Sequence, residues 1–470
     1  MISRDVSRKA MSRVNFQHHH KLQFVPSKAN CRNTFVLFLC VSLFSPVLAF
    51  SQTRNLEILV PPGVVNQSEY TNNLGAMIKD ATVTGATITV YWSDFDCGNA
   101  NCTASGTSHN NYNWSITDAA FQPWEGTNNG KKINIVLQMI SNSFDSTCAS
   151  TGIGSRGVAS AGGYSTGNCA MPAWVWNMLG SSNYTVCNNN GTVQMFGNYF
   201  KSSFQTAYQN AVAALIDHYA NSLAQFKSDY IRVALGHGGE MLPSPQWSGD
   251  CLSQLETWSG ATSQSTFISD WISNWLTPMA DFMGGKNFNG AKTPMQIMGS
   301  ITPMGTDSNC TGCQVPDSIA PVYVLNEMGF GSQGFEISDV GSANGTADWV
   351  YLFGQEHGKV PLELQTLGQS CPGGVGACDS GNINCTVNGH NYSNESLSSC
   401  TGALPTLLPF AESNYATILE IYYQDWDLAN VGSYCTEPGG TTQYCHNESD
   451  PGTGETYGQI TKSALNGWAN

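Results

Sequence analysis

Three glutamates lie within or just after apolar segments of the sequence: Glu240 follows "YIRVALGHGG", Glu363 lies in "VPLELQTLG" and Glu420 lies in "ATILEIYYQDW". A carboxylate at such a position needs a partner or a chemical role, because burying an unpaired charge is costly. Two carboxyl groups about 5 to 5.5 Å apart can hydrolyse a glycosidic bond with retained configuration, one as nucleophile and one as acid/base. The alternative for Glu363 and Glu420 is an ion pair with a residue such as Arg232, and for Glu240 it is an ordinary polar residue where the chain leaves a buried strand.

Alternation along these segments predicts which side chains share a face of a strand. The aliphatic residues of each segment, such as Val233 and Leu364, are expected to face outward. If the first strand keeps its pleat as far as Glu240, that residue faces inward with Arg232. The side chains expected on the inner face are Arg232, Glu240, Glu363, Gln365, Glu420 and Tyr422.

Strand-like runs alternate with helical stretches from Leu56 onward, and this order predicts a parallel sheet covered by helices. The strand candidates cover residues 56–62, 87–96, 133–140, 230–236, 293–301, 330–337, 360–368 and 416–426. Eight strand and helix units predict a single (β/α)8 TIM barrel, an α/β fold, spanning residues 52–470. Active sites of this fold lie at the carboxyl ends of the strands.

The cysteines support the same count of strands. Two of the sixteen, Cys31 and Cys40, lie in the first 51 residues, which leaves fourteen. All fourteen fall between a strand candidate and the helix after it, so the sequence predicts long, disulfide-rich βα loops. Cys310 and Cys313 form an isolated CxxC with no second pair or nearby His, which favours disulfides over zinc. No metal and no cofactor is expected.

Composition narrows the class of partner. The formal net charge is −15 and only 11% of residues are charged, a balance that argues against nucleic acid and disfavours anionic membranes. Residues 1–51 are basic and then apolar ("TFVLFLCVSLFSPVLAF"), which predicts a secretory signal peptide and an extracellular location. The alternative is a signal anchor that stays in the membrane. No later segment is long and apolar enough to span a bilayer.

Four segments occur in an order that resembles a known family. They are "VYWSDFD", "NYNWSITDAAFQPWEG", "MPAWVW" and "YIRVALGHGGE". This order resembles the landmarks of clan A glycoside hydrolases, especially the family 42 beta-galactosidase-like branch. The resemblance covers about Thr87 to Pro243, and the strand order extends it to about Asn430.

The resemblance implies a retaining double displacement on an oligo- or polysaccharide. Glu240 matches the acid/base on the fourth strand, and Glu363 is the acidic residue of the seventh, where the family has its nucleophile. Glu420 is the alternative nucleophile, because Glu363 comes early in its strand. Trp426 is similar to an aromatic residue that commonly floors the sugar subsite in this clan.

Eight residues are predicted to contact the sugar: Trp92, Asp94, Trp174, Arg232, His237, Gln365, Tyr422 and Trp426. For the aromatic residues the alternative is ordinary packing, and for Asp94 it is a helix cap. The clan usually has Asn directly before the acid/base, where this sequence has Gly239. That departure favours a competing hypothesis, a non-catalytic carbohydrate-binding or surface structural protein on the same scaffold.

Overall fold

The computed structural model describes residues 54–61, 64–66, 68–96, 112–125, 130–140, 170–189, 192–222, 230–237, 240–243, 249–284, 296–301, 315–335, 349–366, 386–387, 390–391, 404–431, 435–436, 444–445, 447, 449 and 454–469. Residues Gln52–Asn470 form one compact unit, and the described residues all belong to it. The predicted signal peptide, residues 1–51, lies outside the described residues.

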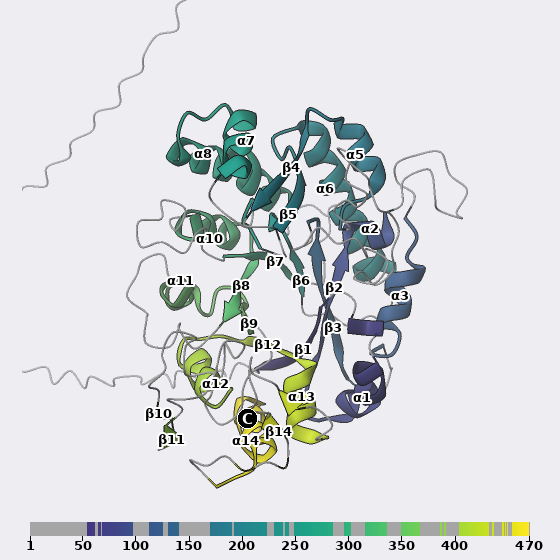
Figure 1. Ribbon diagram of the computed structural model, residues 1–470, viewed down its shortest axis with the longest axis vertical. Helices are drawn as coiled ribbons and strands as arrows, with labels where there is room; N and C mark the ends of the chain where they lie inside the picture. Colours follow the sequence, from purple (N-terminus) through teal and green to yellow (C-terminus); the bar gives the residue numbers. More distant parts are fainter. Residues whose placement is uncertain are drawn as a thin grey trace, which may run out of the picture. The chain divides into compact units, whose positions relative to one another are not determined.

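Eight parallel strands close into a barrel in the order β1-β12-β9-β8-β7-β6-β3-β2 (Figure 1). Their bounds are β1 Asn55–Val60, β2 Gly85–Tyr91, β3 Lys132–Gln138, β6 Tyr230–Val233, β7 Gln296–Ser300, β8 Gly329–Phe335, β9 Leu362–Thr366 and β12 Ile418–Tyr422. The pairing of β1 with β12, from Asn55 opposite Ile418 to Leu59 opposite Tyr422, closes the ring. All eight strand candidates contribute to the barrel, so the predicted barrel fold is confirmed.

Helices lie around the strands (Figure 1). Their bounds are η1 Val64–Asn66, α1 Ser68–Lys79, α2 Trp92–Phe95, α3 Ser115–Phe121, α5 Ala173–Leu179, α6 Ser202–Ile216, η2 Asp217–Ser222, α7 Gly249–Ser259, α8 Gln264–Trp271, η4 Ile272–Leu276, α9 Thr277–Met283, α10 Val315–Leu325, α11 Trp349–Glu356, α12 Leu404–Ser413, α13 Tyr423–Asn430 and α14 Tyr457–Ala469. Small two-stranded sheets lie outside the barrel: β4 Tyr184–Asn189 with β5 Thr192–Gly197, β10 Thr386–Val387 with β11 His390–Asn391, and β13 Cys435–Thr436 with β14 Tyr444–Cys445.

All eight barrel strands end before the last residue of their candidates, and in two of them the strand ends four or more residues early. The candidate 87–96 ends at Tyr91 and the chain turns into α2, while the candidate 416–426 ends at Tyr422 and continues as α13. Each helix has an acidic residue in its first turn, Asp94 in α2 and Asp425 in α13. A carboxylate there satisfies the exposed amides and the positive end of the helix dipole. The apolar and aromatic residues of both segments are typical of strands, so the sequence did not predict that a helix begins there.

Buried side chains separate into two sets along the strands. Val233, Leu364 and Leu419 belong to the main hydrophobic core shared with the helices. Tyr230 and Ile418 form a separate small cluster with Met298. The alternation predicted for β6, β9 and β12 is therefore confirmed. The polar residues that alternate with Val233, Leu364 and Leu419 lie inside the barrel.

The predicted disulfide framework lies mostly outside the described residues. Cys251, in the first turn of α7, is disulfide-bonded. Cys435 and Cys445 are opposite each other in the pairing of β13 with β14. Disulfide-rich loops otherwise stay a prediction. None of the helices in the described ranges has both the length and the apolar character that a bilayer span requires.

Candidate active site

A buried charge network fills the inside of the barrel around Arg232. Its guanidinium donates hydrogen bonds to Glu363 and Gln365, and it lies 3.2 Å from Glu420 Oε2. Arg232, Glu363 and Glu420 have no exposed surface. The hydroxyl of Tyr230 donates to Glu420 as well. Residues of β6, β9 and β12 thus meet at one cation.

Two interior carboxylates each lie opposite a glycine on the strand beside their own. Gly331 on β8 pairs with Glu363 on β9, and a Cβ at Gly331 would lie 1.8 Å from Glu363 Oε2. Gly85 on β2 pairs with Glu57 on β1, and a Cβ there would lie 2.6 Å from Glu57 Oε2. Both contacts are far shorter than any side-chain carbon tolerates. The interior network therefore depends on glycine at both positions.

Glu57 is a third interior carboxylate that sequence reasoning missed. It is fully buried, lies opposite Glu420 in the register of β1 and β12, and accepts a hydrogen bond of 2.8 Å from Thr84 Oγ1. The signal was present, because Glu57 stands between Leu56 and Ile58 just as Glu363 stands between two leucines. An acidic residue alternating with aliphatic ones indicates the same inner face in both strands.

Burial and charge set the protonation of this network. Burial, and then the neighbouring charge of Glu420, raise the pKa of Glu363 to about 8, against the opposing effect of Arg232. Burial disfavours the charge of Arg232, but Glu363 and Glu420 outweigh it and raise the pKa of the guanidinium. Burial therefore favours the protonated form of Glu363, whereas the neighbouring carboxylates favour the charged form of Arg232.

The network matches the ion-pair alternative that the sequence left open for Glu363 and Glu420. A nucleophile must touch the anomeric carbon of a sugar, and neither carboxylate is exposed in this structure. Both carboxylates are instead hydrogen-bonded to Arg232. Arg232 is likewise fully buried, so it does not contact a sugar here.

Glu240 lies in a compact turn beyond the end of β6. The strand ends at Val233, so the pleat does not continue to Glu240 as expected. The amide of Leu235 donates to Glu240 O at 3.2 Å, and the amide of His237 donates to Leu242 O at 2.6 Å. A Cβ at Gly236 would lie 2.0 Å from Leu242 O, so only glycine permits this turn.

Aromatic side chains from α6, α8 and η4 hold this turn from outside the barrel. Tyr208 donates its hydroxyl to Ala234 O at 2.7 Å, and Trp275 donates its indole N–H to Leu235 O. Trp271 donates to Met241 O at 3.2 Å. These donors are buried, so they bind the backbone rather than water. The backbone on both sides of Glu240 is therefore fixed.

The side chain of Glu240 is half-buried, unlike the interior carboxylates. Burial raises its pKa to about 7, and the charge of Arg232 opposes this rise. A carboxyl group with such a pKa can donate and accept a proton near neutral pH. Among the predicted catalytic residues, Glu240 alone combines a raised pKa with exposed surface.

Of three other predicted sugar contacts, two are half-buried and one lies in the turn of Glu240. Gln365 is half-buried and accepts a hydrogen bond from Arg232. Tyr422 is half-buried at the end of β12, where burial and then the charges of Asp425 and Glu420 raise its pKa. His237 is 8% exposed and lies in the turn of Glu240.

Two predicted sugar contacts, Trp92 and Asp94, have other surroundings. Trp92 is fully buried in α2 and packs against Phe204 and Tyr208, so it does not reach a substrate in this structure. Asp94 is 1% exposed and accepts the amide of Tyr91 at 2.7 Å, which makes it a helix cap. These placements match the alternatives that the sequence left open, ordinary packing for Trp92 and a helix cap for Asp94, because the β2 strand ends at Tyr91 and does not continue to Asp96.

Trp426 does not end the eighth strand, which corrects a further prediction. It lies in α13, is 2% exposed and donates its indole N–H to Asp80 Oδ2 at 2.7 Å. Asp80 directly follows α1, whose chain leads into the amino end of β2. The side chain therefore joins helices outside the barrel. Trp174, in contrast, is half-buried at the start of α5.

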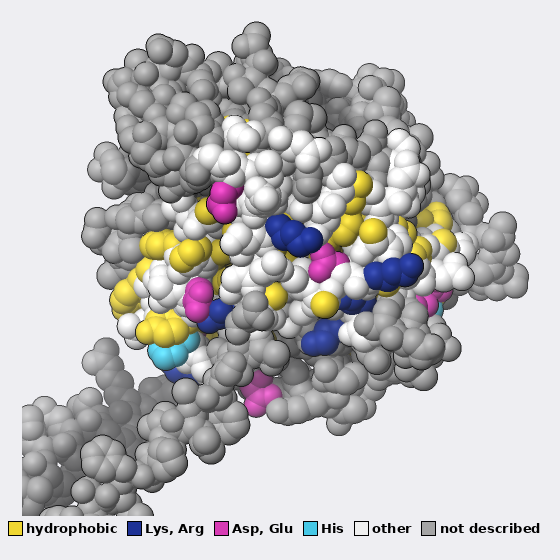
Figure 2. Space-filling model, turned by 90° about the horizontal axis from the view of Figure 1, so that it is seen from below, with side chains coloured by type: hydrophobic (Ala, Val, Ile, Leu, Met, Phe, Trp, Pro, Cys, Tyr) yellow, Lys and Arg dark blue, Asp and Glu magenta, His cyan; other side chains and the backbone are white. Residues whose placement is uncertain are grey.

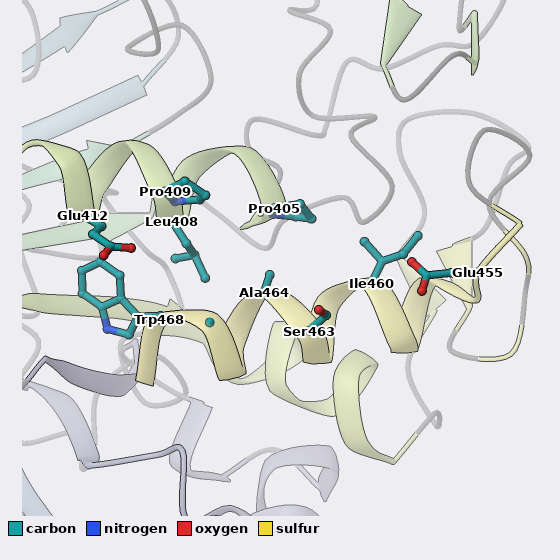
Figure 3. A pocket seen from close by; sticks show the side chains of 10 residues that line it. Pro405, Leu408, Pro409, Glu412, Glu455, Ile460, Ser463, Ala464 and Trp468 are labelled. Carbon is teal, nitrogen blue, oxygen red and sulfur yellow. The ribbon is translucent and has the colours of Figure 1, made fainter. Parts of the chain in front are cut away.

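A groove of about 380 Å³ lies between α12 and α14 (Figure 3). Leu408, Ile460 and Trp468 line it, with Glu412 toward one end and Glu455 toward the other. None of the predicted site residues lines this groove. The face seen from below mixes hydrophobic, basic and acidic side chains, as a solvated surface does (Figure 2). Within the described ranges, no group of three or more His, Cys, Asp or Glu is placed to hold a metal ion.

No family model matches the chain, and no curated protein sequence matches it. Solved structures with a similar course include the catalytic domain of beta-amylase from Paenibacillus polymyxa, at 12% identity and a TM-score of 0.46, covering 79% of this chain and 92% of that one. The intracellular xylanase from Thermoanaerobacterium saccharolyticum has 10% identity and a TM-score of 0.37, covering 79% and 86%. The beta-mannanase from the blue mussel Mytilus edulis has 8% identity and a TM-score of 0.35, covering 78% and 86%. Likeness of this degree assigns no activity, and the family resemblance rests on the sequence landmarks.

Proposed function

We propose that the protein is a glycoside hydrolase in which Glu240 is the acid/base. The observation that carries the proposal is the position and pKa of this carboxyl group. Glu240 follows the fourth strand of the barrel, in a turn fixed by buried aromatic donors, and its pKa is raised to about 7. Glycoside hydrolysis needs such a group to protonate the leaving oxygen.

In the retaining form of the proposal, Glu240 protonates the glycosidic oxygen while a second carboxylate attacks the anomeric carbon. Glu240 then removes a proton from the water that releases the sugar. Glu363, with Glu420 as the alternative, is the proposed nucleophile from the family resemblance. Both are fully buried, so either would have to become accessible to the sugar to act. The acid/base role of Glu240 does not depend on which carboxylate attacks.

The proposed substrate is an oligo- or polysaccharide, and we propose that the protein acts outside the cell. The basic and then apolar residues 1–51 and the fourteen later cysteines support secretion. Expression of the full chain in a secreting host tests it. A secreted product whose amino terminus lies near Ala49 to Gln52 is expected, and retention in the membrane would contradict it.

A second candidate is a non-catalytic carbohydrate-binding protein on the same barrel. The burial of Glu363 and Glu420 against Arg232 favours it, because this arrangement exposes no second catalytic carboxylate from β9 or β12. In that case Glu240 would form hydrogen bonds with a bound sugar, and the sugar would not be cleaved.

A substrate panel separates the two candidates. It comprises aryl glycosides, maltohexaose, xylohexaose and mannohexaose, tested for hydrolysis and for binding. Wild type is compared with Glu240→Gln and with the control Glu256→Gln, a half-buried glutamate of α7. Hydrolysis that falls about a hundredfold or more in Glu240→Gln alone supports the enzyme. Binding without hydrolysis supports the second candidate, and activity unchanged in Glu240→Gln removes Glu240 from the mechanism.

A further inference from the structure

Asp96 binds two tryptophans at the carboxyl end of the barrel. It directly follows α2, the short helix after β2, and is 1% exposed. The indole N–H of Trp92 donates to Asp96 Oδ2 at 2.8 Å, and that of Trp174 donates to Asp96 Oδ1 at 3.0 Å. One buried carboxylate therefore orients two indole rings, one on each oxygen.

The two indoles differ in exposure. Trp92 is fully buried, whereas Trp174 is half-buried. Their ring centroids are 6.2 Å apart and the rings are nearly perpendicular, at 87°. Trp92 thus belongs to the core, and Trp174 extends from that core toward the surface. The carboxylate of Asp96 connects the buried ring to the half-exposed one.

The backbone around Asp96 is fixed as well. Its amide donates to Trp92 O at 3.1 Å, and Asp96 forms an isolated β-bridge with Tyr112. The amide of Ser93 donates to Ala170 O at 3.0 Å, which ties α2 to the chain that leads into α5. The carboxylate and the helix that carries Trp174 are therefore held in one arrangement.

Packing alone does not require this arrangement. A half-exposed indole can donate to water, and a buried carboxylate is unfavourable unless it is hydrogen-bonded. What the contact provides is one fixed orientation of the Trp174 ring. A surface ordered before binding avoids the entropic cost of ordering it on binding. Flat aromatic faces also suit the apolar C–H face of a sugar ring.

We propose that Trp174 is a sugar-stacking platform beside the carboxyl end of β2, and that Asp96 is the positioning residue that holds it. The inference rests on the proposed carbohydrate substrate and applies whether the sugar is cleaved or only bound. Asp96 does not touch the sugar. It acts through the indole of Trp174 and supplies the acceptor that fixes its plane.

The test compares Asp96→Asn, Trp174→Phe and Trp174→Ala with wild type on the glycan of the panel that wild type binds best. An asparagine side chain has one oxygen acceptor, so one indole loses its partner. Phenylalanine keeps a flat ring without the N–H. Both substitutions are expected to raise KM, or Kd for a glycan that is not cleaved, by roughly tenfold. The kcat and its pH profile should stay unchanged, and Trp174→Ala should weaken binding further.

The control is Trp258→Phe, a half-buried tryptophan of α7 away from Asp96, which should leave KM unchanged. The indole N–H resonances of Trp92 and Trp174 should shift in Asp96→Asn, which shows that the contact was broken in a folded protein. If they shift and affinity for the glycan stays as in wild type, the platform is refuted while the proposed function stands. If wild type neither binds nor cleaves any glycan of the panel, both proposals fail.

Discussion

Arg232 and Glu363 meet inside the closed barrel, one from its fourth strand and the other from its seventh, and both are fully buried. Arg232 also binds Glu420 and Gln365. The same guanidinium opposes the rise in the pKa of Glu240. One cation therefore links the interior carboxyl groups to the carboxyl group after the fourth strand. Substitutions of these interior charges should therefore change the pKa of Glu240.

Stability should fall as the pH rises past neutrality. The folded protein raises the pKa of Glu363 from 4.5 to about 8, so it binds this proton more tightly than the unfolded chain does. The stabilisation is complete below the unfolded value and is lost as the pH rises through about 8. Thermal unfolding should give a lower Tm at pH 9 than at pH 6, by at least a few degrees.

Glu363→Gln should remove most of that pH dependence, because the amide is neutral at every pH. Glu256→Gln, at a half-buried site in α7, should retain it. An equal slope of Tm against pH in Glu363→Gln and wild type would show that another group carries the effect.

Arg232→Met should be strongly destabilising. The substitution keeps an apolar stem but leaves Glu363 and Glu420 without their cation inside the barrel. Breaking a buried pair of this kind costs about 3 to 5 kcal/mol. Arg54→Met is the control, because Arg54 pairs with the exposed Glu412 and should cost about 1 kcal/mol or less. Denaturant unfolding of both variants measures the difference, and equal losses would contradict a central role for Arg232.

Gly331→Ala should destabilise the barrel although alanine is a small residue. Its Cβ would lie 1.8 Å from Glu363 Oε2, so the carboxylate must move within a packed interior. The expected loss is about 1 to 3 kcal/mol. Gly354→Ala in α11 is the matched control, because nothing lies within 4 Å of its added carbon. That variant should gain about 0.5 to 1 kcal/mol from helix propensity.

The double variant Gly331→Ala with Glu363→Asp tests the cause. Aspartate is shorter by one methylene, so it should relieve the clash and recover part of the stability lost in Gly331→Ala. A double variant whose losses simply add would show that the clash with Glu363 is not the reason.

The sequence predicted the barrel because its signals are local and repeated. Each strand is a short aliphatic run, and alternation placed Arg232, Glu363 and Glu420 on the inner face without any knowledge of their neighbours. What alternation does not encode is depth along the barrel axis. Alternation predicts that Glu363 and Glu240 both face inward. Glu363 lies in the sealed interior, whereas Glu240 lies half-buried in a turn.

The errors at the strand ends have one physical cause. The sequence predicts Trp92 inside the second strand and Trp426 at the end of the eighth, but both lie in helices that begin directly after Tyr91 and Tyr422. Their indole partners, Asp96 and Asp80, are close in space through helical geometry or a contact between distant segments. Periodicity over a few residues does not distinguish a final strand residue from a first helical turn. The turn at Glu240 was not predicted because periodicity does not mark the end of β6 at Val233 either.

The rate of the proposed glycoside hydrolysis should depend on the ionisation of Glu240. With its pKa raised to about 7, the protonated acid is lost as the pH rises through that value. The pH profile of kcat/KM should therefore show an alkaline limb near pH 7, and Glu240→Gln should lose the limb along with most of the activity. A limb that stays in Glu240→Gln would assign the titration to another group.

The turn that carries Glu240 should be as sensitive as the residue itself. Trp275→Phe removes the indole N–H that binds Leu235 O, leaves a buried carbonyl without that donor, and should cost about 1 to 3 kcal/mol. It should also lower kcat, because Glu240 N and O share the hydrogen bonds of this turn. Trp124→Phe is the matched control: it removes the buried indole bond to Tyr70 at 2.9 Å, far from this turn in sequence. Similar losses of stability with a lower kcat only in Trp275→Phe would show that aromatic donors position the acid/base. An unchanged kcat in Trp275→Phe would contradict this.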